Sequence, residues 1–128
     1  MRLLLDTHAV LWALTSPGAL SAEARAAIVG AEELRLSVVS PWELAIKAAL
    51  GKITLHHPVE SICAELQREF GAAVLPVTLE HVLAVGRLPL HHGDLFDRLL
   101  IAQAQVERLV VVTRDRSFAA YGIPTVEA

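Results

Sequence analysis

The sequence predicts an α/β protein, a three-layer α/β/α sandwich with a mostly parallel sheet of four or five strands. Strand-like runs rich in Leu and Val alternate with helix-like segments along all 128 residues. The chain is 54% hydrophobic but only 5% aromatic, which suits strands buried on both faces beneath helices of small residues. It contains no repeat or linker, so residues 1–128 form a single domain around one substantial core.

The predicted strands are short apolar runs with the length and β-branched character of buried strands. They cover residues 2–6, 34–39, 73–77 and 109–113, and an extended segment follows at 124–126. Helix-like segments separate these runs, so right-handed crossovers between parallel strands are expected.

The predicted helices begin and end at residues that commonly cap helices. They cover residues 9–15, 21–29, 41–50, 59–70, 78–87 and 94–108, with a short helical turn at 116–121. The segment 16–18 (Ser-Pro-Gly) stops the first helix, and a glycine follows each of the next three. Ser40 is the expected N-cap of the third helix, with Pro41 at its first position and Glu43 available for a capping box.

The chain has only four aspartates, and each lies where an apolar run gives way to a helix-like segment. Asp6 and Asp115 follow predicted strands that we expect to be neighbours, while Asp94 and Asp97 open the long helix. Glu43 lies at the head of another helix. Strand ends and helix starts meet at one edge of an open α/β sheet, so these carboxylates are expected to gather there.

Each acid also has a purely structural interpretation. Asp6, Asp94 and Asp115 could be helix caps, and Glu43 stands four residues before Lys47 as an ordinary helix ion pair. A cap, however, needs no second carboxylate from a distant part of the chain. The clustering therefore favours a cation among the acids, and Mg²⁺ or Mn²⁺ is the hard, oxygen-preferring choice.

Phosphodiester hydrolysis is the chemistry that suits such a site, because bound cations activate a water and shield phosphate charge. The sequence has no Gly-rich phosphate loop and no Gly-x-Ser-x-Gly nucleophile motif. The adjacent pairs His56-His57 and His91-His92 have the wrong geometry for a single zinc ion and are expected to be solvated loop residues.

The overall charge limits the partners of the chain. A formal net charge of -3 provides no general basic surface for nucleic acid, so any such binding must rely on local arginines or metal ions. The single Cys63 excludes an internal disulfide. No apolar stretch reaches roughly 18 residues, so no membrane span is expected and a cytoplasmic protein is predicted.

Four motifs, spread in order over nearly the whole chain, resemble those of PIN-domain proteins, and more narrowly of the VapC toxins of bacterial type II toxin–antitoxin pairs. They are Leu-Leu-Leu-Asp6-Thr7-His8, Ser40-Pro-Trp-Glu43-Leu-Ala-Ile-Lys47, His92-Gly-Asp94-Leu-Phe-Asp97-Arg98-Leu-Leu-Ile-Ala-Gln-Ala and Val-Thr113-Arg-Asp115. The third motif has Gly93 and Leu95 around Asp94, where the family commonly has arginine and proline.

The resemblance implies a Mg²⁺-dependent endoribonuclease, with Mn²⁺ as a substitute, that cleaves structured RNA such as transfer or ribosomal RNA and so inhibits translation. It also implies a homodimer inhibited by a cognate VapB antitoxin. The family's acidic quartet, which would bind metal and carry catalysis, falls on Asp6, Glu43, Asp97 and Asp115. Thr113 matches the hydroxyl residue that supports the last aspartate, and we assign a capping role to Asp94.

Four basic residues near the motifs are candidate RNA phosphate contacts, namely Lys47, Arg98, Arg114 and Arg116. Each could equally be solvated or paired with a nearby acid. Trp12 and Trp42 are expected to serve core packing, dimer packing or an antitoxin groove rather than base stacking.

Other functions remain open from the sequence. The chain could be a catalytically silent PIN-like regulator that binds RNA or protein, or a nuclease that acts on DNA. A receiver-like signalling domain has a similar length and fold class, but it would need a phosphoacceptor aspartate after the middle strand and a lysine after the last.

Overall fold

Five parallel strands form the central sheet of the computed structural model, which describes residues 1–128. The strands are β1 (Arg2–Leu5), β2 (Glu33–Ser37), β3 (Ala73–Leu75), β4 (Val110–Thr113) and β5 (Thr125–Glu127). Their order across the sheet is β3-β2-β1-β4-β5, and every neighbouring pair is parallel. The predicted α/β class is confirmed, with five strands that are all parallel.

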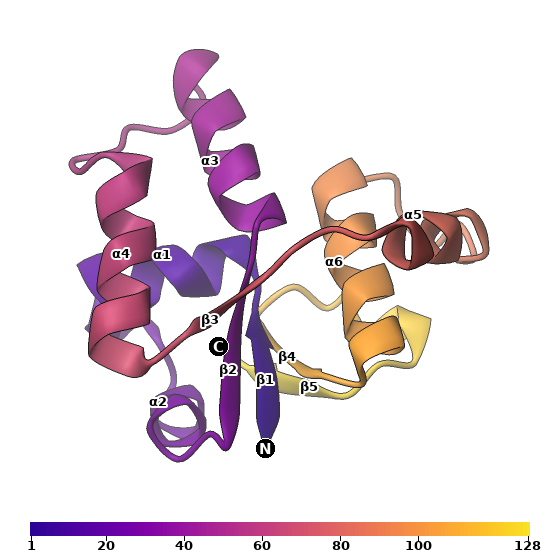
Figure 1. The fold of residues 1–128 in the computed structure, drawn as a ribbon, viewed down its shortest axis with the longest axis horizontal. Helices are drawn as coiled ribbons and strands as arrows, with labels where there is room; N and C mark the ends of the chain where they lie inside the picture. The colour runs from indigo at the N-terminus through magenta and orange to yellow at the C-terminus, as the bar shows by residue number, and fades with distance from the viewer.

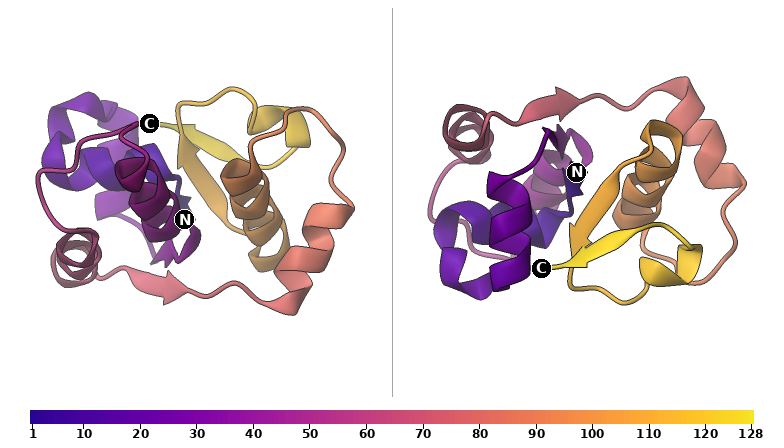
Figure 2. Two further views of the ribbon diagram at one scale, coloured as in Figure 1. Left: turned by 90° about the horizontal axis from the view of Figure 1, so that it is seen from above. Right: turned by 90° about the horizontal axis from the view of Figure 1, so that it is seen from below.

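Helices cover both faces of this sheet (Figures 1 and 2). They are α1 (Thr7–Thr15), α2 (Ala22–Val29), α3 (Val39–Ala49), α4 (Val59–Phe70), α5 (Leu79–Gly86) and α6 (Leu95–Glu107), with short 3₁₀ helices η1 (Pro17–Ala19) and η2 (Ala119–Tyr121). Helices α1, α2 and α4 lie on one face, and α5 and α6 lie on the other (Figure 1). None of the helices is both long and apolar enough to cross a membrane.

The core consists of two apolar clusters, one on each face of the sheet. Leu3 and Leu5 belong to the cluster beneath α1, α2 and α4, whereas Leu4 belongs to the cluster beneath α6. All three leucines are fully buried. Successive side chains of a strand point to opposite faces, so a strand covered on both sides must be apolar throughout. This is why β1 carries no polar residue between Arg2 and Asp6.

Helix α3 begins differently from the sequence prediction. It starts at Val39, and the hydroxyl of Ser37 accepts a hydrogen bond from the Val39 amide at 3.1 Å. Ser40, the predicted N-cap, is instead buried inside the first turn. The predicted capping box of Ser40 and Glu43 is therefore wrong, because strand β2 ends at Ser37 and leaves room for an earlier start.

Helix α3 stands at the end of the sheet where β1 and β2 finish, and it contacts helices from both layers, α1 and α4 on one side and α6 on the other (Figure 1). This position brings Glu43 toward the start of α1, and it brings α6 close to both. The fold thus collects the first turns of three helices above the carboxyl ends of the central strands.

Candidate active site

Asp6 directly follows β1, and Thr113 is the last residue of the adjacent strand β4. The Asp6 carboxylate caps α1, with Oδ1 accepting from the Ala9 amide at 2.8 Å. Its Oδ2 accepts from the Thr113 hydroxyl at 2.6 Å. The side chain is only 5% exposed, and this burial raises the pKa of Asp6 above its ordinary value. The predicted adjacency of the strands before Asp6 and Asp115 is confirmed.

Asp115 lies just beyond β4 and is exposed to solvent. Its carboxylate accepts a hydrogen bond from the Ser117 amide at 2.9 Å and another from the Ser117 hydroxyl. The hydroxyl bond is the main reason that the pKa of Asp115 is lowered. Thr113 was predicted to support this aspartate, and its oxygen does accept from the Asp115 amide at 3.0 Å. The Thr113 proton, however, goes to Asp6 and not to the Asp115 carboxylate.

Glu43 enters the site from α3 and is only 3% exposed. The hydroxyl of Thr7, at the start of α1, donates to Glu43 Oε1 at 2.6 Å and lies 3.2 Å from the Ser40 hydroxyl. Lys47 pairs with the other carboxylate oxygen of Glu43, as its i+4 position predicts, and this hydrogen bond raises the pKa of Lys47. The Lys47 ammonium is therefore already paired with Glu43, one of the acids of the site.

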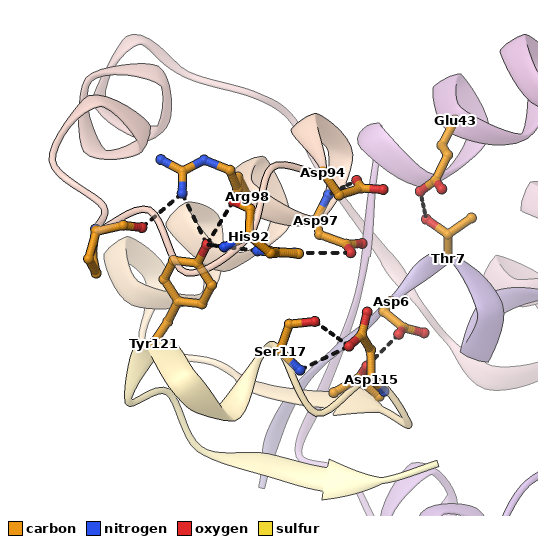
Figure 3. A network of polar contacts seen from close by, with 12 residues as sticks. Asp6, Thr7, Glu43, His92, Asp94, Asp97, Arg98, Asp115, Ser117 and Tyr121 are labelled. Atoms are coloured by element: carbon orange, nitrogen blue, oxygen red, sulfur yellow. Dashed lines mark hydrogen bonds and ion pairs between the residues drawn. The ribbon is translucent and has the colours of Figure 1, made fainter.

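Asp94 and Asp97 occupy the first turn of α6 and have different roles. Asp94 is the N-cap and accepts from the Asp97 amide at 2.9 Å, so its predicted capping role is confirmed. The Asp97 carboxyl points toward Asp6 and Asp115 (Figure 3). Burial raises the pKa of Asp97 to about 7, and the charges of Asp94, Glu43 and Asp115 add to the shift. Acids from three separate segments thus act on one carboxyl.

Sequence reasoning missed His92, which lies half-buried between Tyr121 and Asp97 and is not a solvated loop residue. His92 is the first residue of the third motif, five positions before Asp97, and this was the available signal. Arg98 was proposed as an RNA contact, and burial contradicts this. Its side chain is 8% exposed and donates to Tyr121 and to backbone carbonyls, including that of Pro89. The Arg98 guanidinium cannot reach a phosphate without breaking these hydrogen bonds.

Arg114 is also held by the protein, although its side chain lies at the surface. It donates to the carbonyls of Ala128 and Ala19, and its guanidinium lies 4.3 Å from the centre of the Trp12 ring. Arg116 is exposed and has no hydrogen bond or ion pair within the chain. Among the four basic candidates, Arg116 is the side chain available for a phosphate.

The motifs and this geometry agree with a comparison against known families, in which the model of the PIN domain matches residues 3–124. The chain belongs to the PIN-domain family. This PIN-domain chain is 33% identical to Ribonuclease VapC22 of Mycobacterium tuberculosis, over 94% of the chain and 92% of the relative. Membership of the PIN-domain family excludes the alternative that the chain is a receiver-like signalling domain.

Solved structures have the same PIN fold. The crystal structure of VapBC2 from Rickettsia felis, bound to a DNA fragment from its promoter, matches with a TM-score of 0.74 at 14% identity over 98% of each chain. The structure of FitAcB from Neisseria gonorrhoeae matches with a TM-score of 0.67 at 21% identity, over 98% of this chain and 97% of that one. At 14% and 21% identity, these two structures show only that the fold is shared.

The site of this PIN domain contains carboxylate oxygens, which suit a hard cation. These oxygens are not arranged as a complete set of metal ligands. No group of three or more His, Cys, Asp or Glu side chains is arranged to hold a metal ion. Asp6, Asp97 and Asp115 nevertheless face a common space (Figure 3), and burial together with neighbouring charge already disfavours ionisation of Asp97. A Mg²⁺ ion held by a few carboxylates and several waters fits such a donor set.

Proposed function

We propose that the chain is a Mg²⁺-dependent endoribonuclease and the toxin of a toxin–antitoxin pair, with Mn²⁺ as a substitute ion. Its substrate would be structured RNA, transfer or ribosomal, so that cleavage inhibits translation. The observation that carries the proposal is that charges of Asp94, Glu43 and Asp115, from three segments, act on the buried carboxyl of Asp97, while Glu43 also acts on Asp6. A structural cap has no need of this convergence.

Asp6, Asp97 and Asp115 would hold the metal, with Glu43 contributing from α3. When bound, Mg²⁺ supplies an activated water and neutralises charge on the phosphate being cleaved. The other residues of the site hold these carboxylates in position. Thr113 holds Asp6, and Thr7 holds Glu43 from the neighbouring helix. Arg116 is the exposed cation that can attract the RNA backbone beside Asp115.

The proposed protein partners are a VapB-type antitoxin and a second copy of the chain. The names of the solved VapBC structures from Rickettsia felis and Mycobacterium tuberculosis support the first partner. Exposed apolar side chains support a protein partner in general. Trp42 is 52% exposed and lies edge-on to Phe96, with ring centres 4.8 Å apart, and Leu95 beside it is 79% exposed.

The test is cleavage of total cellular RNA by the purified chain, with Mg²⁺, with Mn²⁺ and with EDTA. We expect discrete fragments that require metal and that disappear in Asp6→Asn. Glu60→Gln is the matched control, because it neutralises an exposed carboxylate on α4 away from the site. The fragment ends would identify the RNA. Absence of cleavage with either metal, in protein shown to be free of antitoxin, would support the silent RNA- or protein-binding alternative.

A further inference from the structure

His92 connects the body of the protein to the carboxyl of Asp97. It lies on the loop between α5 and α6, and its side chain is 19% exposed. Its Nδ1 is 2.7 Å from the Tyr121 hydroxyl, and its Nε2 is 3.3 Å from Asp97 Oδ2 (Figure 3). The imidazole therefore bridges η2, near the end of the chain, and the first turn of α6.

The hydrogen bonds around Tyr121 fix the direction of this bridge. Its oxygen receives a hydrogen bond from Arg98 Nη1 at 3.0 Å and another from the His92 amide at 3.2 Å. A guanidinium is only a donor, so the Arg98 bond cannot reverse. The single hydroxyl proton of Tyr121 is therefore available for donation to an acceptor. The closest is His92 Nδ1, at 2.7 Å, whereas the His92 carbonyl is 3.4 Å away.

Proton donation from Tyr121 determines the tautomer of His92. When Nδ1 of a neutral imidazole accepts a hydrogen bond, the ring proton lies on Nε2. Nε2 faces Asp97, so His92 donates to the carboxylate. The result is a one-way chain of hydrogen bonds from Arg98 through Tyr121 and His92 to Asp97.

Arg98 anchors this chain in the scaffold. Besides Tyr121, its guanidinium donates to the carbonyls of Pro89 at 2.9 Å, Leu88 at 3.4 Å and Val85 at 3.5 Å. These carbonyls close α5 and begin the loop that carries His92. Any displacement of this buried guanidinium would break its hydrogen bonds to several carbonyls at once. Arg98 therefore holds the loop that carries His92 in a fixed position relative to α6.

We propose that His92, oriented by Tyr121, is a positioning residue that holds the carboxylate of Asp97 for metal binding. The inference rests on the proposed function, in which Asp97 is a metal ligand. With Oδ2 restrained by His92, Oδ1 is left for the space shared with Asp6 and Asp115. Partners that orient ligating groups typically contribute about 10–100-fold to metal affinity or activity.

The first test reads the tautomer directly, without metal and without RNA. Long-range ¹H–¹⁵N NMR correlations of the His92 ring at pH 8 should show the Nε2–H form in the wild type. Tyr121→Phe keeps the aromatic ring but removes the proton donated to Nδ1, so the Nε2–H form should no longer be fixed. An Nδ1–H tautomer in the wild type would overturn the proposal.

The second test measures Mn²⁺ binding by electron paramagnetic resonance, together with RNA cleavage. A glutamine amide can donate from about the position of the ring Nε2, whereas the shorter asparagine cannot. His92→Asn should weaken Mn²⁺ binding and cleavage about 10–100-fold, and His92→Gln should retain most of both. His91→Ala is the control, because His91 also packs edge-on against Tyr121 but has no hydrogen bond to Asp97.

The two proposals fail in different ways. A wild-type chain that neither binds Mn²⁺ nor cleaves RNA overturns the proposed function, and with it the role of Asp97 that His92 would serve. A wild-type chain that does both, with His92→Asn unchanged or with His92→Gln equally impaired, overturns the positioning role alone. Thermal unfolding of every variant separates a folding defect from either result.

Discussion

The Thr113 hydroxyl donates a hydrogen bond to the Asp6 carboxylate at 2.6 Å, across two neighbouring parallel strands. The same oxygen accepts from the Asp115 amide at 3.0 Å. One side chain thus links the first and last acids of the candidate site, although 107 residues separate Thr113 from Asp6. This hydroxyl therefore adds to the backbone ladder, in which the Asp6 amide donates to the Val112 carbonyl at 3.1 Å, in placing the two acids.

Thr113→Val should weaken both the fold and the site. It leaves the buried Asp6 carboxyl with one fewer donor, which should cost about 1–3 kcal/mol of the free energy of unfolding. The Thr113 hydrogen bond lowers the pKa of Asp6, so its loss should raise that pKa further. Urea unfolding measures the stability, and Thr113→Ser, which keeps the hydroxyl, is the control. Equal stability of the Val and Ser variants would contradict the expectation.

Asp6→Asn should abolish cleavage while the free energy of unfolding stays the same or increases. Burial and the charge of Glu43 both disfavour the ionised Asp6, and asparagine carries no charge. Asparagine is also a good N-cap, so its oxygen can still accept from the Ala9 amide. Thermal unfolding and RNA cleavage should be measured on the same preparation. Inactivity that arose from a large loss of stability would count against the metal-binding role.

Asp94→Asn should retain substantial cleavage activity, whereas Asp97→Asn should not. Asparagine caps helices about as well as aspartate, so the start of α6 should survive the first change. The second change removes the carboxyl that faces the other acids. Initial rates with saturating Mg²⁺ would compare the two variants directly. A similar loss of activity in both would refute the division of roles between these aspartates.

Local sequence patterns predicted the elements well because strand periodicity and helix caps act over a few residues. The helix at Val59–Phe70 has the predicted bounds, and Ser21, Thr78 and Asp94 cap their helices as their positions suggested. The resemblance to PIN domains, rather than any local rule, assigned the predicted metal-binding role to Asp6, Glu43, Asp97 and Asp115 among these acids.

Tertiary contacts account for what the sequence did not predict. Ser40 has the local features of an N-cap, but Thr7, 33 residues earlier, lies 3.2 Å from its hydroxyl inside the fold. Arg98 lies on a helix that looks amphipathic, but Tyr121, 23 residues later, lies beside it. His92 is likewise held by Tyr121, 29 residues later, although its other partner, Asp97, is only five residues away. No pattern in a short window contains Thr7 or Tyr121, the distant partners that place these three side chains.

Arg98→Lys should destabilise the protein without acting through RNA. A lysine has no planar fork, so it cannot serve Tyr121 and the loop carbonyls together. The loss of buried, charge-assisted hydrogen bonds should cost at least about 2 kcal/mol of the free energy of unfolding. Arg116→Ala is the comparison, because this exposed side chain should affect cleavage and leave stability within about 0.5 kcal/mol. A stable Arg98→Lys that binds Mn²⁺ as the wild type does but no longer cleaves RNA would restore the RNA-contact hypothesis for Arg98.

Stability without metal should fall as the pH rises through the range set by Asp97. Its pKa is about 7 in the native state against an ordinary 3.8, so between these values the native state binds more protons than the unfolded state. The free energy of unfolding therefore decreases with increasing pH in this window. The raised pKa of Asp6 acts in the same direction. The lowered pKa of Asp115 acts in the opposite direction, but only as the pH falls below about 4.

Mg²⁺ should reverse this trend, because it binds the ionised carboxylates and stabilises the native state that holds them. Saturating Mg²⁺ should raise the Tm more at pH 8 than at pH 5. In Asp97→Asn without metal, the decrease in stability between pH 5 and pH 8 should be smaller than in the wild type. Thermal unfolding at several pH values, with Mg²⁺ and with EDTA, measures both effects. An equal increase in Tm at both pH values would mean that Mg²⁺ binds elsewhere than at these acids.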